Sequence, residues 1–317
     1  MSERRGQPKM NSSIILAFDV GGTQIKVAAV SGGTIIGPSV AHYESRAELA
    51  ADEIINNFVR IVRDVIAKVE QDNQRICGLG MAFPGPFDYE NGISLIQGLG
   101  KFDSLYRLPI GKLLEEALRS DATLQEKFAP EFHITFENDA ALFGLGEAVY
   151  GEAQGADRVV CLTIGTGLGS CFLEHGRLVK QRSDVPDNGW LYEVSYRNGI
   201  ADDYISKRGI IQLALELGMD LRGRDVRELA NSAISDEPDA RQLFELFGQR
   251  MALILSPALR VFVPDRIILG GQISKSGFLF AHTFQEGLAS QGLRTDVLIS
   301  QDTLTSTFKG IYDYVRG

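Results

Sequence analysis

Two stretches of the chain share one design, in which a short apolar segment runs into a glycine turn and then into a second apolar segment. The first covers residues 14–30 and turns at Gly21 and Gly22, and the second covers residues 159–173. Such segments are too short for buried helices and are rich in β-forming residues, so each stretch predicts a β-hairpin. Two hairpins about half a chain apart favour two similar lobes that face one cleft. The second turn consists of Gly165, Thr166 and Gly167.

The glycine turns point to phosphate binding. Without a Cβ, backbone N–H groups can approach a ligand closely, and successive N–H groups form an anion-binding concavity. No Walker motif is present at the first turn and no helix follows it directly, so this is not a P-loop. A third turn, Gly270 and Gly271, follows the apolar run 267–269. Taken alone, a Gly-Gly hairpin is better explained as an ordinary turn, and it is the recurrence of the pattern that favours phosphate binding. The polar residues around the first turn are Asp19, Thr23, Gln24 and Lys26.

The remaining pattern is that of an α/β protein. Apolar residues recur at helical spacing over 47–71, which predicts an amphipathic helix packed on a sheet. The 239–263 segment predicts a long helix that Pro257 kinks or ends, and its Phe and Met face is either core or a dimer surface. Alternation of strands and helices indicates α/β lobes. Further helices are expected over 110–118, 225–233 and 305–315, and further strands over 76–83 and 132–136.

The order of five motifs resembles the ROK family of sugar kinases and repressors, within the actin-like (hexokinase and heat-shock) ATPase superfamily. The resemblance implies an α/β, two-lobed actin-like ATPase (ribonuclease H-like) fold with a central interdomain cleft. Residues 14–134 and 300–317 would form the first lobe and residues 135–299 the second, with the last helix packing back on the first lobe. The motifs are D-V-G-G-T-Q-I-K (19–26), F-P-G-P (83–86), E-N-D-A (137–140), T-I-G-T-G-L-G (163–169) and L-G-G-Q-I-S (269–274).

The resemblance also assigns roles to residues. It implies that the first two turns bind the phosphates of ATP, that the third lies by the adenosine, and that Mg²⁺ accompanies the nucleotide, with Asp19 as the candidate protein residue near the ion. Asp139 matches the catalytic aspartate, Asn138 a sugar-binding asparagine, and Gly85 lies in the loop along the sugar pocket. A carboxylate within reach of a sugar hydroxyl can accept its proton during attack on the γ-phosphorus. From the residues alone, Asn138 or Asp139 is equally well explained as a helix N-cap.

The chain departs from the family on the sugar side. Where related kinases carry an Asn-Leu pair, this chain has Gly98 and Leu99, and the zinc cluster of the family is missing, so no structural zinc is expected. Gapped matches place Glu193 and Asp202 at sugar-binding glutamates and Tyr196 at the family's histidine. The alternative is that both carboxylates are solvated surface residues. With tyrosine in place of a zinc ligand, the loop must be held by packing.

Composition excludes several classes of function. A net charge of −9 argues against a nucleic acid or an anionic membrane as the partner. Residues 1–11 lack the apolar core of a signal peptide, no apolar run approaches transmembrane length, and too few residues precede the first strand for a DNA-binding domain. Three cysteines, Cys77, Cys161 and Cys171, fit neither a disulfide framework nor a zinc site. We therefore expect a cytoplasmic protein.

The sequence thus predicts ATP-dependent phosphorylation of a sugar hydroxyl, by family analogy the 6-hydroxyl of a hexose or N-acetylhexosamine, with Asp139 as general base. The expected partners are a small-molecule sugar and a nucleotide, and homodimers are common in the family. One alternative is a sugar-sensing protein with weak or no catalysis. Another is a different phosphate chemistry, such as acyl-phosphate formation or polyphosphate as donor.

Overall fold

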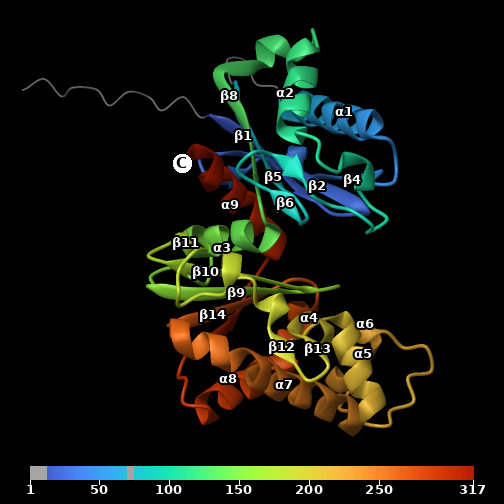
Figure 1. The fold of residues 1–317 in the computed structure, drawn as a ribbon, viewed down its shortest axis with the longest axis vertical. Coiled ribbons are helices and arrows are strands. Elements are labelled where there is room, and N and C mark those ends of the chain that lie inside the picture. Colours follow the sequence, from blue (N-terminus) through green and yellow to red (C-terminus); the bar gives the residue numbers. More distant parts are fainter. Residues whose placement is uncertain (1–12, 70–74) are drawn as a thin grey trace, which may run out of the picture. The chain divides into compact units, whose positions relative to one another are not determined.

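The computed structural model describes residues 13–69 and 75–317 (Figure 1). The chain divides into two compact units. Unit 1 contains the described residues up to Asn138 together with Ile311–Gly317, and unit 2 is Asp139–Gly310. The predicted absence of a signal peptide over residues 1–11 lies outside the described residues.

Unit 1 is built on one mixed sheet with strand order β3-β2-β1-β5-β8, and β4 pairs with the first half of β2. The first predicted hairpin is β1 and β2, which pair antiparallel, whereas β5 and β8 run parallel to β1. A small separate hairpin, β6 and β7, follows the F-P-G-P loop. The strands are β1 (Ile14–Val20), β2 (Gln24–Ser31), β3 (Thr34–Ile35), β4 (Ala41–Glu44), β5 (Ile76–Ala82), β6 (Phe87–Asp88), β7 (Ile93–Ser94) and β8 (Phe128–Glu137).

Two helices of unit 1 pack on each other, α1 (Ala51–Val69) and α2 (Ile110–Ser120). The apolar stripe predicted for 47–71 is buried along α1, from Ile54 to Val69. The helix begins four residues later than predicted, at Ala51, and the predicted end at 70–71 lies outside the described residues. Burial of one face therefore explains why this helix is amphipathic.

Unit 2 repeats the topology of unit 1. Its sheet has the order β11-β10-β9-β14-β15, with an antiparallel hairpin (β9 and β10) followed by two strands parallel to β9. A short hairpin, β12 and β13, stands apart from this sheet. The repeated order matches the two similar lobes expected from the paired glycine hairpins. The strands are β9 (Arg158–Ile164), β10 (Leu168–Glu174), β11 (Arg177–Val179), β12 (Ser195–Tyr196), β13 (Gly199–Ile200), β14 (Arg266–Gly270) and β15 (Asp296–Ile299).

The long helix α7 (Pro238–Phe262) supplies the core of unit 2. The side chains of Phe244, Phe247 and Met251 are fully buried in this core. The Phe and Met face of α7 is therefore core and not a dimer surface. Pro257 lies inside α7 and does not end it. The other helices that contribute to this unit are α3 (Asp139–Tyr150), α4 (Ala201–Tyr204), α5 (Lys207–Glu216), α6 (Val226–Ile234), α8 (Ala281–Ser290) and the first part of α9 (Thr303–Arg316).

The end of α9 packs on the first sheet, as expected. Its residues from Ile311 onward belong to unit 1. A Cβ on Gly80 would lie 2.3 Å from a methyl of Ile311, and one on Gly78 would lie 2.5 Å from a methyl of Val315. Glycines in the middle of β5 therefore make room for this helix.

Two further findings concern the described residues. Across 13–69 and 75–317, none of the helices has the length and apolar character needed to cross a membrane. Cys77, Cys161 and Cys171 are free thiols, the last two buried opposite each other on β9 and β10.

Candidate active site

At the first glycine turn, contacts among the described residues engage carbonyl groups and leave two neighbouring N–H groups without an acceptor. Gly21 closes the turn by donating its N–H to the Gln24 carbonyl at 2.9 Å. Ser45, which is buried, donates its hydroxyl to the Gly22 carbonyl at 2.7 Å and its N–H to the Thr23 carbonyl at 3.0 Å. Within the described part of the chain, the N–H groups of Gly22 and Thr23 make no hydrogen bond. The turn therefore presents donors, which is the polarity that an anion requires.

Asp19 and Lys26 flank this turn as a cross-strand pair. They are register partners on β1 and β2, and the Lys26 ammonium lies 2.8 Å from Asp19 Oδ2. A partly buried pair of this kind holds both side chains in place. The charge of Lys26 is thus already balanced within the protein.

The second turn follows the same plan in unit 2. Gly165 donates its N–H to the Gly167 carbonyl at 2.9 Å, and the Gly165 carbonyl accepts the N–H of Lys207 at 2.9 Å. Among the residues described, Thr166 and Gly167 use their N–H groups in no hydrogen bond. Both turns therefore offer two adjacent backbone donors.

Asp202 lies against the second turn. Its Oδ1 accepts the N–H of Leu168 at 2.6 Å, and its other oxygen pairs with Arg208 at 2.6 Å. A Cβ on Gly167 would lie 2.6 Å from the same Oδ1. The carboxylate therefore holds the turn, a contact that the sequence did not indicate.

The third turn lies beside the second. Gly271 has a φ of +89°, and a Cβ there would lie 2.5 Å from the Ile164 carbonyl oxygen, directly before Gly165. A Cβ on Gly270 would lie 2.5 Å from the ring of Phe143. Contacts within the protein thus account for both glycines.

Asn138 and Asp139 lie where β8 ends and α3 begins. The carboxylate of the buried Glu137 accepts a hydrogen bond from the Asn138 N–H at 2.8 Å. The same carboxylate lies near the Tyr314 hydroxyl, and the burial of Tyr314, together with this negative charge, raises the pKa of Tyr314 to about 12. Asp139 is the first residue of α3, is exposed, and accepts the Ala140 N–H at 2.9 Å. A carboxylate in the first turn of a helix is favoured by the helix dipole.

The other residues predicted to contact the sugar are placed as follows. Gly85 is exposed near the hydroxyl of Tyr89. Glu193 is exposed. Its carboxylate lies beside Tyr192, and the partial burial of Tyr192, together with this carboxylate, raises the pKa of Tyr192 to about 12. Tyr196 packs edge to face on Tyr204, with ring centroids 4.9 Å apart.

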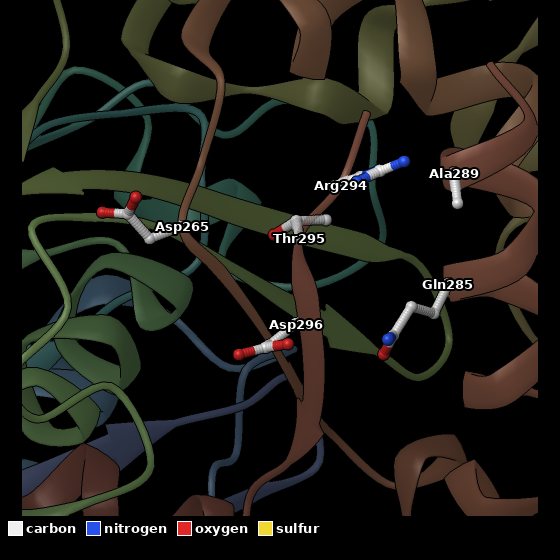
Figure 2. Close-up of a pocket in the computed structure, with 6 residues that line it drawn as sticks. All are labelled: Asp265, Gln285, Ala289, Arg294, Thr295 and Asp296. Carbon is white, nitrogen blue, oxygen red and sulfur yellow. The ribbon is translucent and has the colours of Figure 1, made fainter. Parts of the chain in front are cut away.

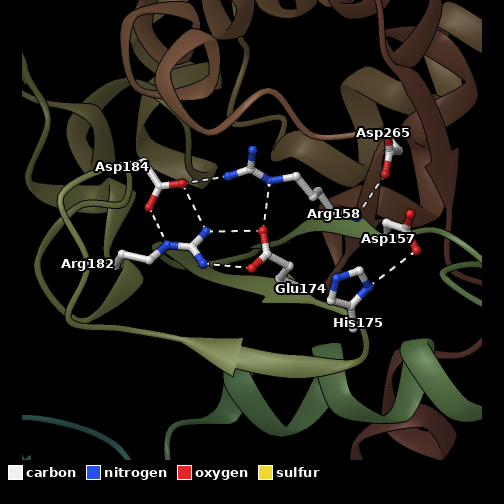
Figure 3. Close-up of polar contacts among 7 residues, drawn as sticks. All are labelled: Asp157, Arg158, Glu174, His175, Arg182, Asp184 and Asp265. Carbon is white, nitrogen blue, oxygen red and sulfur yellow. Dashed lines mark hydrogen bonds and ion pairs between the residues drawn. The ribbon is translucent and has the colours of Figure 1, made fainter.

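A charged network anchors the segment that leads to Glu193 (Figure 3). Arg158 pairs with Glu174 at 3.2 Å and with Asp184 at 2.5 Å, and Arg182 contacts the same two carboxylates. The Arg158 guanidinium also lies 4.2 Å from the centre of the Phe262 ring. The pKa of Glu174 and the pKa of Asp184 are both lowered, mainly by the hydrogen bonds that Arg182 donates to them.

Ser170 provides a second anchor for this segment. Its buried hydroxyl donates to the Gly189 carbonyl at 2.7 Å and accepts the Leu191 N–H at 2.8 Å. Ion pairs and buried hydrogen bonds thus hold the segment that leads to Glu193.

A pocket of about 500 Å³ lies elsewhere in unit 2, beside β14, β15 and α8 (Figure 2). None of the residues predicted for the active site lines it. Its lining residues are Asp265, Gln285, Ala289, Arg294, Thr295 and Asp296.

Sequence reasoning missed Ser45 and Lys101. Ser45 holds the carbonyls of the first turn, and Lys101 lies over Gly22, since a Cβ on Gly22 would lie 2.5 Å from its Cδ. Both are far from residues 21–24 along the chain. The one signal for Lys101 was its place after the glycines at 98 and 100.

Comparison with known proteins identifies a family and a fold. A model of the ROK family matches residues 15–303. The glucokinase of Thermotoga maritima is 25% identical over 324 residues, covering 95% of this chain and 91% of that protein. The N-acetyl-D-glucosamine kinase of Mannheimia succiniciproducens is 24% identical over 288 residues, covering 84% of this chain and 86% of that protein.

A solved structure resembles the chain over nearly its whole length. It is a ROK family glucokinase from Streptomyces griseus in complex with glucose and AMPPNP, with a TM-score of 0.71 at 20% identity. The match covers 96% of this chain and 99% of that one. This likeness confirms the predicted actin-like α/β ATPase fold.

Proposed function

Since the chain belongs to the ROK family and is a sugar kinase, we propose that its phosphate donor is ATP and its acceptor the 6-hydroxyl of a hexose or an N-acetylhexosamine. The observation that carries the proposal is the polarity of the two glycine turns. In each, contacts among the described residues engage carbonyl groups and leave two neighbouring N–H groups without an acceptor, at Gly22 and Thr23 and at Thr166 and Gly167. Hydrogen bonds from such donors to a charged phosphate contribute roughly 1.5–3 kcal/mol each.

Asp139 acts in this proposal as the general base. Its carboxylate accepts the proton of the sugar hydroxyl as that oxygen forms a bond to the γ-phosphorus, and the bond from this phosphorus to the β–γ bridging oxygen breaks to release ADP. Its place as the exposed first residue of α3 keeps the carboxylate accessible. Phosphoryl transfer needs little covalent chemistry beyond this, because positioning and charge stabilisation supply most of the rate.

Magnesium fits beside the first turn. When bound with a nucleotide, Mg²⁺ neutralises charge on the phosphates and takes its ligands mainly from phosphate oxygens, water and one or two carboxylates. Asp19 offers a hard oxygen donor two residues before Gly21, and its pairing with Lys26 fixes its position. Among the residues described, no group of three or more His, Cys, Asp or Glu side chains is arranged to hold a metal ion on its own.

The test is ADP release, coupled to a dehydrogenase, with a panel of hexoses, aminosugars and N-acetylated sugars. We expect turnover that depends on sugar, and a kcat for Asp139→Asn that is lower by about 10²–10⁴, the range attributed to general-base catalysis. The matched control is Asp239→Asn, which changes another exposed aspartate in the first turn of a helix of unit 2. It should keep the activity of the wild type.

Two outcomes would contradict the proposal. If Asp139→Asn retained the kcat of the control variant, this residue would not be the base. If no sugar supported turnover while sugar binding remained measurable by calorimetry, the protein would be a sensor and not a kinase for any of these sugars.

A further inference from the structure

We propose that Lys101 is a phosphate-binding residue of the first glycine turn, contacting an oxygen of the nucleotide's polyphosphate chain. This inference rests on the proposed function, since it assumes that this turn receives the donor. It adds a cation to a site for which sequence reasoning had named only Lys26.

The first argument is the position of the side chain. The stem of Lys101 lies so close to Gly22 that a Cβ on this glycine would be 2.5 Å from Cδ and 3.4 Å from the ammonium nitrogen. The neighbouring N–H groups of Gly22 and Thr23 have no hydrogen-bond acceptor within the described part of the chain. A cation and two backbone donors therefore gather at one turn.

The second argument is charge balance. Lys26 is compensated by Asp19 at 2.8 Å, whereas Lys101 makes neither an ion pair nor a hydrogen bond to any of the residues described. An ammonium group close to backbone donors and without a counter-ion raises the local positive potential. An anion that binds there gains a charge-assisted hydrogen bond.

The third argument is that the backbone around Lys101 is fixed. Asp103 accepts the N–H groups of Leu99 at 3.1 Å and Gly100 at 2.9 Å through its two carboxylate oxygens. Phe102 is fully buried, donates its N–H to the Ala47 carbonyl at 2.6 Å and packs on Phe83 with ring centroids 5.2 Å apart. The position of Lys101 near the turn therefore follows from the packing of unit 1.

The fourth argument concerns Gly22. Its φ lies outside the left-handed region that demands glycine, so backbone conformation does not explain the residue. The close approach of Lys101 does explain it, because any side chain at this position would displace the lysine stem from the turn. Gly22 thus gives the cation access to the donors.

The test measures binding by calorimetry and not catalysis. We expect Lys101→Met, which keeps the stem and removes the charge, to raise the Kd for AMPPNP and for inorganic tripolyphosphate by about 10- to 100-fold, the equivalent of losing one charged hydrogen bond. The Kd for adenosine, which has no phosphate, should change less than about 2-fold. Lys101→Arg should restore most of the affinity because it keeps the charge.

The control is Lys112→Met, which removes an exposed lysine of the same unit that pairs loosely with Glu116 at 3.9 Å. Equal AMPPNP affinities for Lys101→Met and Lys112→Met would overturn the inference, as would a parallel loss of adenosine affinity or a wild type that binds no AMPPNP. Failure of the proposed function looks different. In that case the wild type would bind AMPPNP in a Lys101-dependent way but phosphorylate no sugar, and the inference would stand.

Discussion

Gly271 provides a quantitative test of how unit 2 is packed around its glycine turns. The residue has a φ of +89°, and a Cβ there would lie 2.5 Å from the carbonyl oxygen and 2.6 Å from the nitrogen of Ile164. In Gly271→Ala the left-handed backbone costs about 1–2 kcal/mol. The contact adds about 1–3 kcal/mol, the usual cost of overpacking, because the obstructing atoms are backbone and cannot rotate away. We therefore expect a loss of about 2–5 kcal/mol in the free energy of unfolding.

The control that separates these two costs is Gly155→Ala. Gly155 has a similar φ of +77°, but a Cβ there would meet no atom within 4 Å. It should therefore lose only the backbone contribution, about 1–2 kcal/mol. The difference between the two variants measures the steric contribution alone.

The assay is urea unfolding followed by tryptophan fluorescence. The chain has a single tryptophan, Trp190, and it lies in unit 2 with both glycines, so the signal reports the unit that is perturbed. Equal unfolding midpoints for the two variants would refute the steric argument. If instead Gly271 were needed only for the approach of a nucleotide, its variant would lose AMPPNP affinity without a shift in midpoint beyond that of Gly155→Ala.

Two further predictions concern the segment that leads to Glu193. Ser170→Ala should lower the free energy of unfolding by about 1–3 kcal/mol, because it leaves a buried N–H and a buried carbonyl without partners, and an unchanged urea midpoint would contradict this. The hydrogen bond to Arg182 holds the pKa of Glu174 below its ordinary 4.5, so this carboxylate contributes stability at neutral pH that is lost as the pH falls through the lowered pKa. Glu174→Gln should therefore reduce the decrease in melting temperature between pH 7 and about pH 3, and an acid sensitivity equal to that of the wild type would contradict the assignment.

The core and the order of elements could be predicted because they are encoded locally. Buried strands such as β1 and β9 are short apolar runs of β-forming residues, and the stripe along α1 repeats with the period of a helix. The fate of the Phe and Met face of α7 could not be decided in this way. An apolar face buries itself equally well in a core or in an interface, and only the surrounding helices of unit 2 settle that it is core.

Contacts between segments that are distant in sequence limit how much of the candidate site can be predicted. The glycine turns were found from the sequence because strand, turn and strand are contiguous. Ser45, Lys101 and the contact of Asp202 with the second turn were not found, since each depends on a side chain brought in from elsewhere in the chain. Asp202 was matched to a sugar-binding position by a gapped motif match. Such a match contains no information about the hydrogen bond that Asp202 accepts from the Leu168 N–H.

The two turns share a backbone design but differ in charge. At the second turn the carboxylate of Asp202 is part of the structure, and its charge is compensated by Arg208 at 2.6 Å. At the first turn Asp19 and Lys26 compensate each other, and Lys101 adds a cation that no described residue balances. Two unit charges 4 Å apart interact by about 4 kcal/mol at the effective dielectric constant typical of protein surfaces. A phosphate at the first turn therefore gains charge attraction that the second turn does not offer, and we infer that the most highly charged part of a nucleotide is favoured at Gly22.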